Sequence, residues 1–221
     1  MDGAAVSMRT ISVSTPTHGR VLIKDGVSTA PRRLLVGFHG YAQSAEDMLA
    51  ELELIPGSGQ WTLVSIQALH RFYTRRMEKI VASWMTRQDR EDAIADNVAY
   101  VDRALDTVLE GARNIPIVFV GFSQGVAMAY RAAVLGRHRP QSIVAIGGDV
   151  PPEVKTAAAG KFPPVLIAGG MQDELYLPSH LETDSTFLRA HGVAVEVFRY
   201  SGGHEWTADL RQRIHDVLAG S

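Results

Sequence analysis

Short apolar runs alternate along this chain with longer segments whose apolar residues recur at helical spacing. Apolar strands that alternate with helices indicate a mostly parallel sheet covered by helices on both faces. The first two of about eight strands are predicted to pair antiparallel through the turn PTHG at 16–19. The predicted strands lie in RTISVST, GRVLIKDG, RRLLVGFHG, WTLVSIQAL, IPIVFV, SIVAIGG, PPVLIAGG and VAVEVFRYSG.

The helical segments have recognisable ends. In the segment 44–55, Ser44 is followed three residues later by Asp47, which is the spacing of a capping box, and Pro56 ends the helix. The other predicted helices cover 90–112, 123–136, 178–192 and 205–220. No linker or internal repeat divides the chain, so we expect one α/β domain over residues 1–221, without a large cap domain.

Residues 67–90 have no clear period, and a connection of this length is usually functional. The stretch mixes aromatic residues with Arg71, Arg75, Arg76 and Lys79. One interpretation makes it a wall of a substrate pocket, with Trp84 against the substrate and the basic residues at the rim. The other makes it a surface excursion that packs a few residues on the core.

Composition narrows the function classes. The chain has 221 residues and a formal net charge of −2, which gives no electrostatic reason to expect nucleic acid or an anionic membrane surface as partner. It contains no cysteine, which excludes disulfides and a cysteine nucleophile. We find no signal peptide and no apolar run long enough for a membrane span. We therefore expect a cytoplasmic protein.

The stretch GFSQG, residues 121–125, lies where a strand-like run becomes a helix-like one. Such a Ser between two glycines is typical of a nucleophile elbow, a sharp turn that exposes the hydroxyl. Side chains at Gly121 and Gly125 would collide with neighbouring backbone in so sharp a turn. We therefore predict that Ser123 is a nucleophile.

A serine nucleophile needs a base, and the base needs a carboxylate to orient it. In this kind of site the chain order is Ser, then Asp or Glu, then His. His204 is the predicted base, because it lies on a glycine-rich turn just past the final strand. Asp173 is the predicted acid, and Asp149 is the alternative. The remaining candidates are His138, His180, His191 and His215 for the base, and Glu174 and Asp184 for the acid.

Two backbone amides are predicted to bind the oxyanion. One belongs to Gln124, the residue after the serine, and the other to Tyr41, in the loop FHGYAQSAEDM. We interpret His39 as a structural residue that orients this loop. The side chains of Tyr41 and Gln43 are predicted to flank the acyl group.

Four motifs of this chain resemble those of the phospholipase/carboxylesterase family of α/β-hydrolases, which includes the acyl-protein thioesterases. In chain order they are HGYAQSAEDM, GFSQG, GGMQDELYLP and YSGGHEW. The resemblance extends from about residue 33 to the end of the chain. It implies an α/β-hydrolase fold, a triad of Ser123, Asp173 and His204, and no cofactor. Thioesterase members typically have HGLGD where this chain has HGYAQ, which favours a carboxylesterase.

Together these features predict a serine carboxylesterase that hydrolyses small to medium acyl esters through an acyl-enzyme. The alternative is a lysophospholipase or acyl-protein thioesterase. A serine peptidase, an amidase and a non-catalytic binding protein with a hydrolase fold are further alternatives. The expected partner is a small-molecule ester, with no nucleic acid and no metal, and a homodimer stays open.

Overall fold

Within the residues that the computed structural model describes (8–27, 32–76, 78–112, 114–156 and 159–220), seven strands form one sheet in the order β1-β3-β2-β6-β7-β8-β9. Neighbouring strands run parallel except at β1, which pairs antiparallel with β3. The strands are β1 (Arg20–Lys24), β2 (Leu34–Phe38), β3 (Thr62–Gln67), β6 (Ile117–Phe122), β7 (Ser142–Ile146), β8 (Val165–Gly170) and β9 (Val195–Tyr200).

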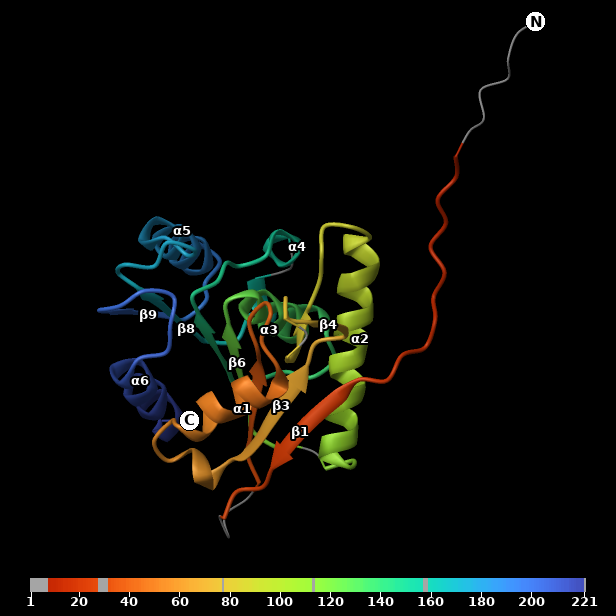
Figure 1. Cartoon of the computed structure of the whole chain (residues 1–221). Helices are drawn as coiled ribbons and strands as arrows, with labels where there is room; N and C mark the ends of the chain where they lie inside the picture. Colours follow the sequence, from red (N-terminus) through yellow and green to blue (C-terminus); the bar gives the residue numbers. More distant parts are fainter. Residues whose placement is uncertain (1–7, 28–31, 77, 113, 157–158, 221) are drawn as a thin grey trace, which may run out of the picture.

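Helices cover both faces of this sheet (Figure 1). They are α1 (Ala45–Glu53), α2 (Arg90–Leu109), α3 (Gln124–Leu135), α4 (Pro152–Lys155), α5 (Pro178–Ala190) and α6 (Ala208–Ala219), with 3-10 turns η1 (Ser58–Gln60) and η2 (Ala159–Lys161). Leu35 belongs to the apolar core beneath α1 and α6, whereas its neighbours Leu34 and Val36 belong to the core beneath α2, α3 and α5. This alternation confirms the predicted sheet with helices on both faces.

The start of α1 has the predicted capping box. The N–H of Asp47 donates to Oγ of Ser44 at 3.2 Å, and the Asp47 carboxylate accepts the N–H of Ser44 at 2.8 Å. Two backbone donors that the first turn leaves unpaired are thereby satisfied. The helix ends at Glu53, ahead of Pro56 as predicted.

The strand predicted over 9–15 is wrong. Residues 8–19 form no strand, and β1 pairs with β3 instead, with Arg20 opposite Gln67. The segment leads away from β1 (Figure 1), and Ile11 and Val13 are each 72% exposed. Alternating apolar residues favour an extended backbone, but a strand also needs a neighbouring edge and an apolar surface to cover, and this segment has neither.

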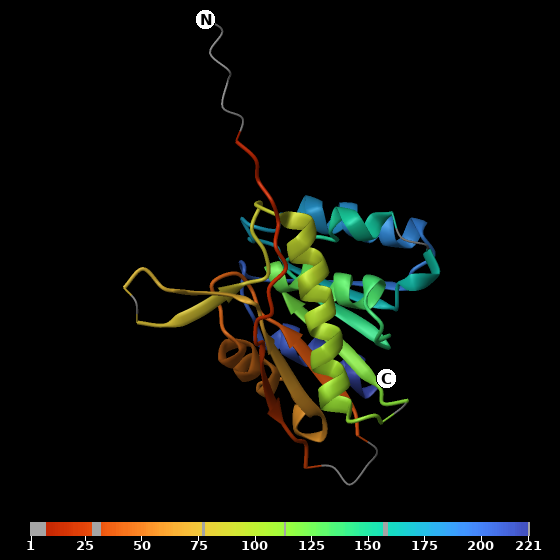
Figure 2. The ribbon, with the colours of Figure 1, turned by 90° about the vertical axis from the view of Figure 1, so that its right-hand side faces the viewer.

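The aperiodic stretch 67–90 contains a hairpin of its own. β4 (His70–Tyr73) pairs antiparallel with β5 (Ile80–Ser83), apart from the main sheet. It projects from the body of the molecule (Figure 2). β4 is mostly exposed, so no alternation of apolar and polar residues marked it in the sequence.

Three of the parallel strands end at the same edge of the sheet. β6 ends at Phe122, β8 at Gly170 and β9 at Tyr200, and Gly170 lies opposite Tyr200 in the register. Ligands of open α/β sheets bind outside this carboxyl edge. The residues that follow these three strands are therefore the first place to look for a site. No helix in the described part of the chain is long and apolar enough to cross a bilayer.

Candidate active site

Ser123 lies in a sharp turn between β6 and α3. Its backbone has φ 54° and ψ −121°, a conformation that L-residues rarely adopt. The N–H of Ser123 donates to the carbonyl of Ile146 at 2.8 Å, which ties the turn to β7. This hydrogen bond to β7 helps to keep the Ser123 backbone in its strained conformation.

Both glycines of the turn are required by close backbone contacts. A Cβ at Gly121 would lie 2.6 Å from Cα of Val126, and a Cβ at Gly125 would lie 2.0 Å from the carbonyl oxygen of Phe38. Backbone atoms of a strand and a helix cannot move aside as a flexible side chain can. The contacts confirm the predicted reason for the two glycines.

Replacing Gly125 by alanine is expected to lower the free energy of unfolding by about 1–3 kcal/mol, because the new methyl group overpacks the turn against β2. Urea denaturation of the wild type and the variant measures the loss. Gly59→Ala is the control, since no atom lies within 4 Å of a Cβ at that position. Equal stability of the two variants would contradict the steric role.

The buried Asp173 and the partly buried His204 form a hydrogen-bonded pair next to this turn. Oδ2 of Asp173 accepts from Nδ1 of His204 at 2.8 Å, and Oδ1 accepts the N–H groups of Leu175 and Tyr176, each at 2.8 Å. The carboxylate can accept but not donate, so the imidazole proton lies on Nδ1. Nε2 of His204 is buried and has no hydrogen-bond partner in the described part of the chain. It is left as a proton acceptor.

Ser123 and His204 line one cleft of about 300 Å³. Gly147 also lines this cleft and lies against the Asp173–His204 pair, because a Cβ at Gly147 would lie 3.1 Å from Cε1 of His204. The structure therefore brings Ser123, His204 and Asp173 together at the carboxyl edge of the sheet. On the side of α2 and α3, the cleft is lined by Arg90, Gln124, Ala127 and Arg131. The rest of its lining is Gly148, Asp149, Pro151, Pro152, Leu175 and Tyr176.

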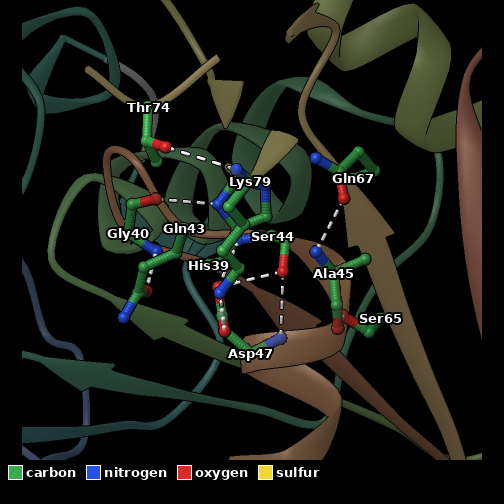
Figure 3. A network of polar contacts seen from close by, with 10 residues as sticks. All are labelled: His39, Gly40, Gln43, Ser44, Ala45, Asp47, Ser65, Gln67, Thr74 and Lys79. Carbon is green, nitrogen blue, oxygen red and sulfur yellow. Dashed lines mark hydrogen bonds and ion pairs between the residues drawn. The ribbon is translucent and has the colours of Figure 1, made fainter. Parts of the chain in front are cut away.

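The loop after β2 is held by the buried His39 (Figure 3). Nδ1 of His39 lies 2.7 Å from the carbonyl oxygen of Gly40, and Nε2 lies 3.1 Å from the N–H of Ala68. These contacts require a neutral ring that donates from Nδ1 and accepts at Nε2. Burial lowers the pKa of His39, which favours the same neutral form. His39 orients the loop, as interpreted from the sequence.

The direction of the Gly40 carbonyl decides where the next amide points. In a trans peptide the C=O and N–H groups point in opposite directions, so the N–H of Tyr41 points away from His39. The loop lies against the serine, since a Cβ at Gly40 would be 3.3 Å from Cβ of Ser123. Among the described residues, neither the N–H of Tyr41 nor that of Gln124 donates a hydrogen bond. Both amides are free to bind an oxygen atom.

Two side chains predicted to contact substrate lie elsewhere. Trp84 is fully buried, and its indole N–H donates to the carbonyl of His39 at 2.8 Å, so it belongs to the core rather than to a pocket wall. Oε1 of Gln43 accepts the N–H of Gly40 at 2.7 Å (Figure 3), and Gln43 holds the loop instead of lining the cleft. The Tyr41 side chain is 62% exposed and packs on Phe72.

Arg71 and Lys79, two of the basic residues predicted to form a rim, do not line this cleft. Arg71 donates to the carbonyl of His18 at 2.9 Å, and Lys79 pairs with Asp47 at 2.5 Å (Figure 3). Both lie on a separate depression beside β1. The basic side chains of the cleft are Arg90, the last residue of the aperiodic stretch and the first of α2, and Arg131 of α3. For Arg131 the sequence offered one indication. Its spacing from Gln124 and Ala127 places all three residues on one face of α3.

The side chain of Gln124 was also missed. Its Oε1 accepts the N–H of Trp84 at 2.9 Å, and its Nε2 donates to the carbonyl of Met85 at 3.1 Å. These bonds tie the first residue of α3 to the chain that leaves β5. The side chain of Gln124 thus fixes the position of the residue whose backbone N–H is free.

The alternative acids and bases have other partners. Asp149 lies 3.5 Å from His180 rather than beside His204, and burial together with the Asp184 charge raises the pKa of Asp149. Asp184 is buried and accepts the N–H of Val150. Glu174 is exposed. The other histidines bind Asp106 (His138), the carbonyl of Phe187 (His191) and the carbonyl of Pro56 (His215).

Comparison with known proteins gives the family and the fold of the chain. The sequence profile described as Phospholipase/Carboxylesterase matches residues 22–219. Comparison with curated proteins finds no match. Among solved structures, esterase PE8 is 23% identical with a TM-score of 0.72, covering 92% of this chain and 99% of its own. Acyl-protein thioesterase 2 of Zea mays is 19% identical, with a TM-score of 0.72 and the same coverage. The Bacillus cereus carboxylesterase is 20% identical with a TM-score of 0.69, covering 91% of this chain and 94% of its own.

Proposed function

This chain belongs to the phospholipase/carboxylesterase family, a family of hydrolases, and from that premise we propose that it is a serine carboxylesterase acting through Ser123, His204 and Asp173. One observation carries the proposal. The Asp173–His204 pair leaves a buried Nε2 acceptor without a partner, in the same cleft as a serine on a strained turn. A base so placed is what a serine hydroxyl needs in order to attack a carbonyl.

In the proposed reaction, Oγ of Ser123 attacks the acyl carbonyl while Nε2 of His204 takes the hydroxyl proton. The amides of Tyr41 and Gln124 bind the oxyanion of the tetrahedral intermediate. His204 then gives its proton to the leaving alcohol, and an acyl-enzyme remains on Ser123. A water molecule, deprotonated by His204, repeats the attack and releases the carboxylic acid.

Asp173 acts on the tautomer and charge of His204. Its two backbone hydrogen bonds fix the carboxylate, and its bond to Nδ1 keeps Nε2 free to accept a proton. Its negative charge also stabilises the imidazolium that forms in the transition state. We propose oxygen esters rather than acyl-protein thioesters as substrates, because HGYAQ lacks the aspartate of the HGLGD sequence typical of thioesterase members.

Labelling with a fluorophosphonate probe tests this proposal. We expect one equivalent of probe to react with the native protein and the label to map to the peptide that contains Ser123. Denatured protein is the control, because unfolding separates Ser123 from His204. Hydrolysis of 4-nitrophenyl esters and of matched thioesters of increasing acyl length then identifies the preferred acyl group. A native protein that neither reacts with the probe nor hydrolyses any ester would refute the proposal.

A further inference from the structure

Arg131 is a buried arginine in the wall of the cleft that also holds Ser123 and His204. Its side chain is 3% exposed, and its Nε donates to the Glu153 carboxylate. Within the described residues, neither terminal nitrogen of Arg131 has a hydrogen-bond partner, and neither is fully enclosed by protein. Arg131 lines the cleft, so its terminal nitrogens are unused donors at the cleft wall. On a side chain that is only 3% exposed, such donors favour a ligand group that accepts from them.

The charges around Arg131 favour an anion. Glu153 lies between two guanidinium groups, since Arg90 donates to its second oxygen at 2.6 Å. One carboxylate therefore faces two positive charges. Burial lowers the pKa of Arg131, although the guanidinium stays protonated. The carboxylate of Asp149 also lines the cleft, but it is 66% exposed and lies 3.5 Å from His180.

The position of Arg131 indicates which part of the substrate it meets. His204 must protonate the leaving alcohol, so the alcohol lies beside His204 and the acyl chain extends along the other wall. That wall is the face of α3 with Gln124, Ala127 and Arg131. Ser123 and Arg131 are eight residues apart, which is about 12 Å along a helix, and an arginine side chain leans back toward the helix start, so the guanidinium lies nearer to the serine than this rise. A short dicarboxylic acyl chain such as adipate therefore suits the gap.

Resting on the esterase function proposed above, we propose that the substrates are esters whose acyl chain ends in a carboxylate. Arg131 binds that carboxylate through its two terminal nitrogens, and Arg90 contributes positive charge at the rim. The ligand class is therefore a monoester of a short dicarboxylic acid. This subsite makes Arg131 a specificity-determining residue for the acyl group.

The test compares kcat/KM for mono-4-nitrophenyl adipate with kcat/KM for 4-nitrophenyl hexanoate, after the rates without enzyme are subtracted. We expect the wild type to prefer the adipate monoester by about 10-fold or more. In Arg131→Gln this preference should fall by about 10- to 100-fold, the loss expected for charge-assisted hydrogen bonds. Arg90→Gln should reduce the preference less, and it serves as the second variant if Arg131→Gln does not fold. The matched control is Arg137→Gln, an exposed arginine that pairs with Asp102 and Asp106 outside the cleft.

Each result separates this inference from the esterase function. Hydrolysis of the hexanoate ester without a preference for the adipate ester, or an unchanged preference in both cleft variants, overturns the anionic subsite and leaves the esterase intact. A preference that appears only for acetate esters of carboxylated alcohols overturns the acyl-side placement. Hydrolysis of neither ester overturns the esterase function, and the subsite with it.

Discussion

Replacing Ser123 by alanine is expected to lower kcat for 4-nitrophenyl esters by about 10³–10⁶-fold. The variant keeps the cleft and the free amides of Tyr41 and Gln124, so substrate binding and oxyanion stabilisation remain while the covalent route is lost. Steady-state hydrolysis measures the effect, and circular dichroism checks that the variant is folded. The strained backbone at Ser123 belongs to the turn and not to the hydroxyl, so we expect the fold to persist.

A matched control for this variant is Ser142→Ala. Ser142 is a buried serine at the start of β7, at the opposite edge of the sheet from Ser123, and its hydroxyl has no partner among the described residues. Its loss should leave kcat within about threefold of the wild type, because most substitutions away from special features have small effects. If Ser123→Ala retained more than a tenth of the wild-type rate, Ser123 would not be the nucleophile.

Replacing Asp173 by asparagine is expected to lower kcat by about 10⁴-fold. The N–H groups of Leu175 and Tyr176 both point at Oδ1, so the asparagine oxygen will take that place and its NH₂ group will face Nδ1 of His204. Nδ1 must then accept a hydrogen bond, which moves the imidazole proton to Nε2. In that tautomer His204 cannot take the proton of Ser123.

The pH dependence of the residual rate separates this tautomer effect from a folding defect, and urea denaturation gives the stability. Glu174→Gln is the control, because Glu174 is the exposed neighbour of Asp173. Asp149→Asn tests the rival acid. A large loss of kcat in Asp149→Asn together with a small loss in Asp173→Asn would reverse the assignment of the acid.

Several features of this protein were predictable because they depend on neighbours in the sequence. The apolar runs of β2 and β6 to β9, the capping box at Ser44 and the helical stripe of α2 are local patterns, and the structure contains each of them. The GFSQG turn is also visible in the sequence, and the need for glycine at Gly121 arises within a few residues of Ser123, whereas the need at Gly125 comes from Phe38 of β2. The catalytic roles of Ser123, Asp173 and His204 stay predictions, although the structure places the three residues together.

Other features required the tertiary structure because they depend on which distant residue a side chain meets. Residues 9–15 had the alternation of a strand but found no sheet edge, whereas β4, which is mostly exposed and has no such pattern, formed a hairpin with β5. From the sequence, Trp84 was interpreted as part of a pocket wall. In the structure its indole N–H donates to the His39 carbonyl, and Trp84 is a core residue.

The sequence by itself determined the larger strands and helices from β2 onward, the serine turn and the residue types that follow each of those strands, because local periodicity and backbone sterics suffice for them. Only the tertiary structure decided which of the candidate histidines meets a buried carboxylate, and it selected His204 with Asp173. It also placed the buried guanidinium of Arg131 in the same cleft as Ser123. A side chain's surroundings come from segments far apart in the chain, and packing brings those segments together.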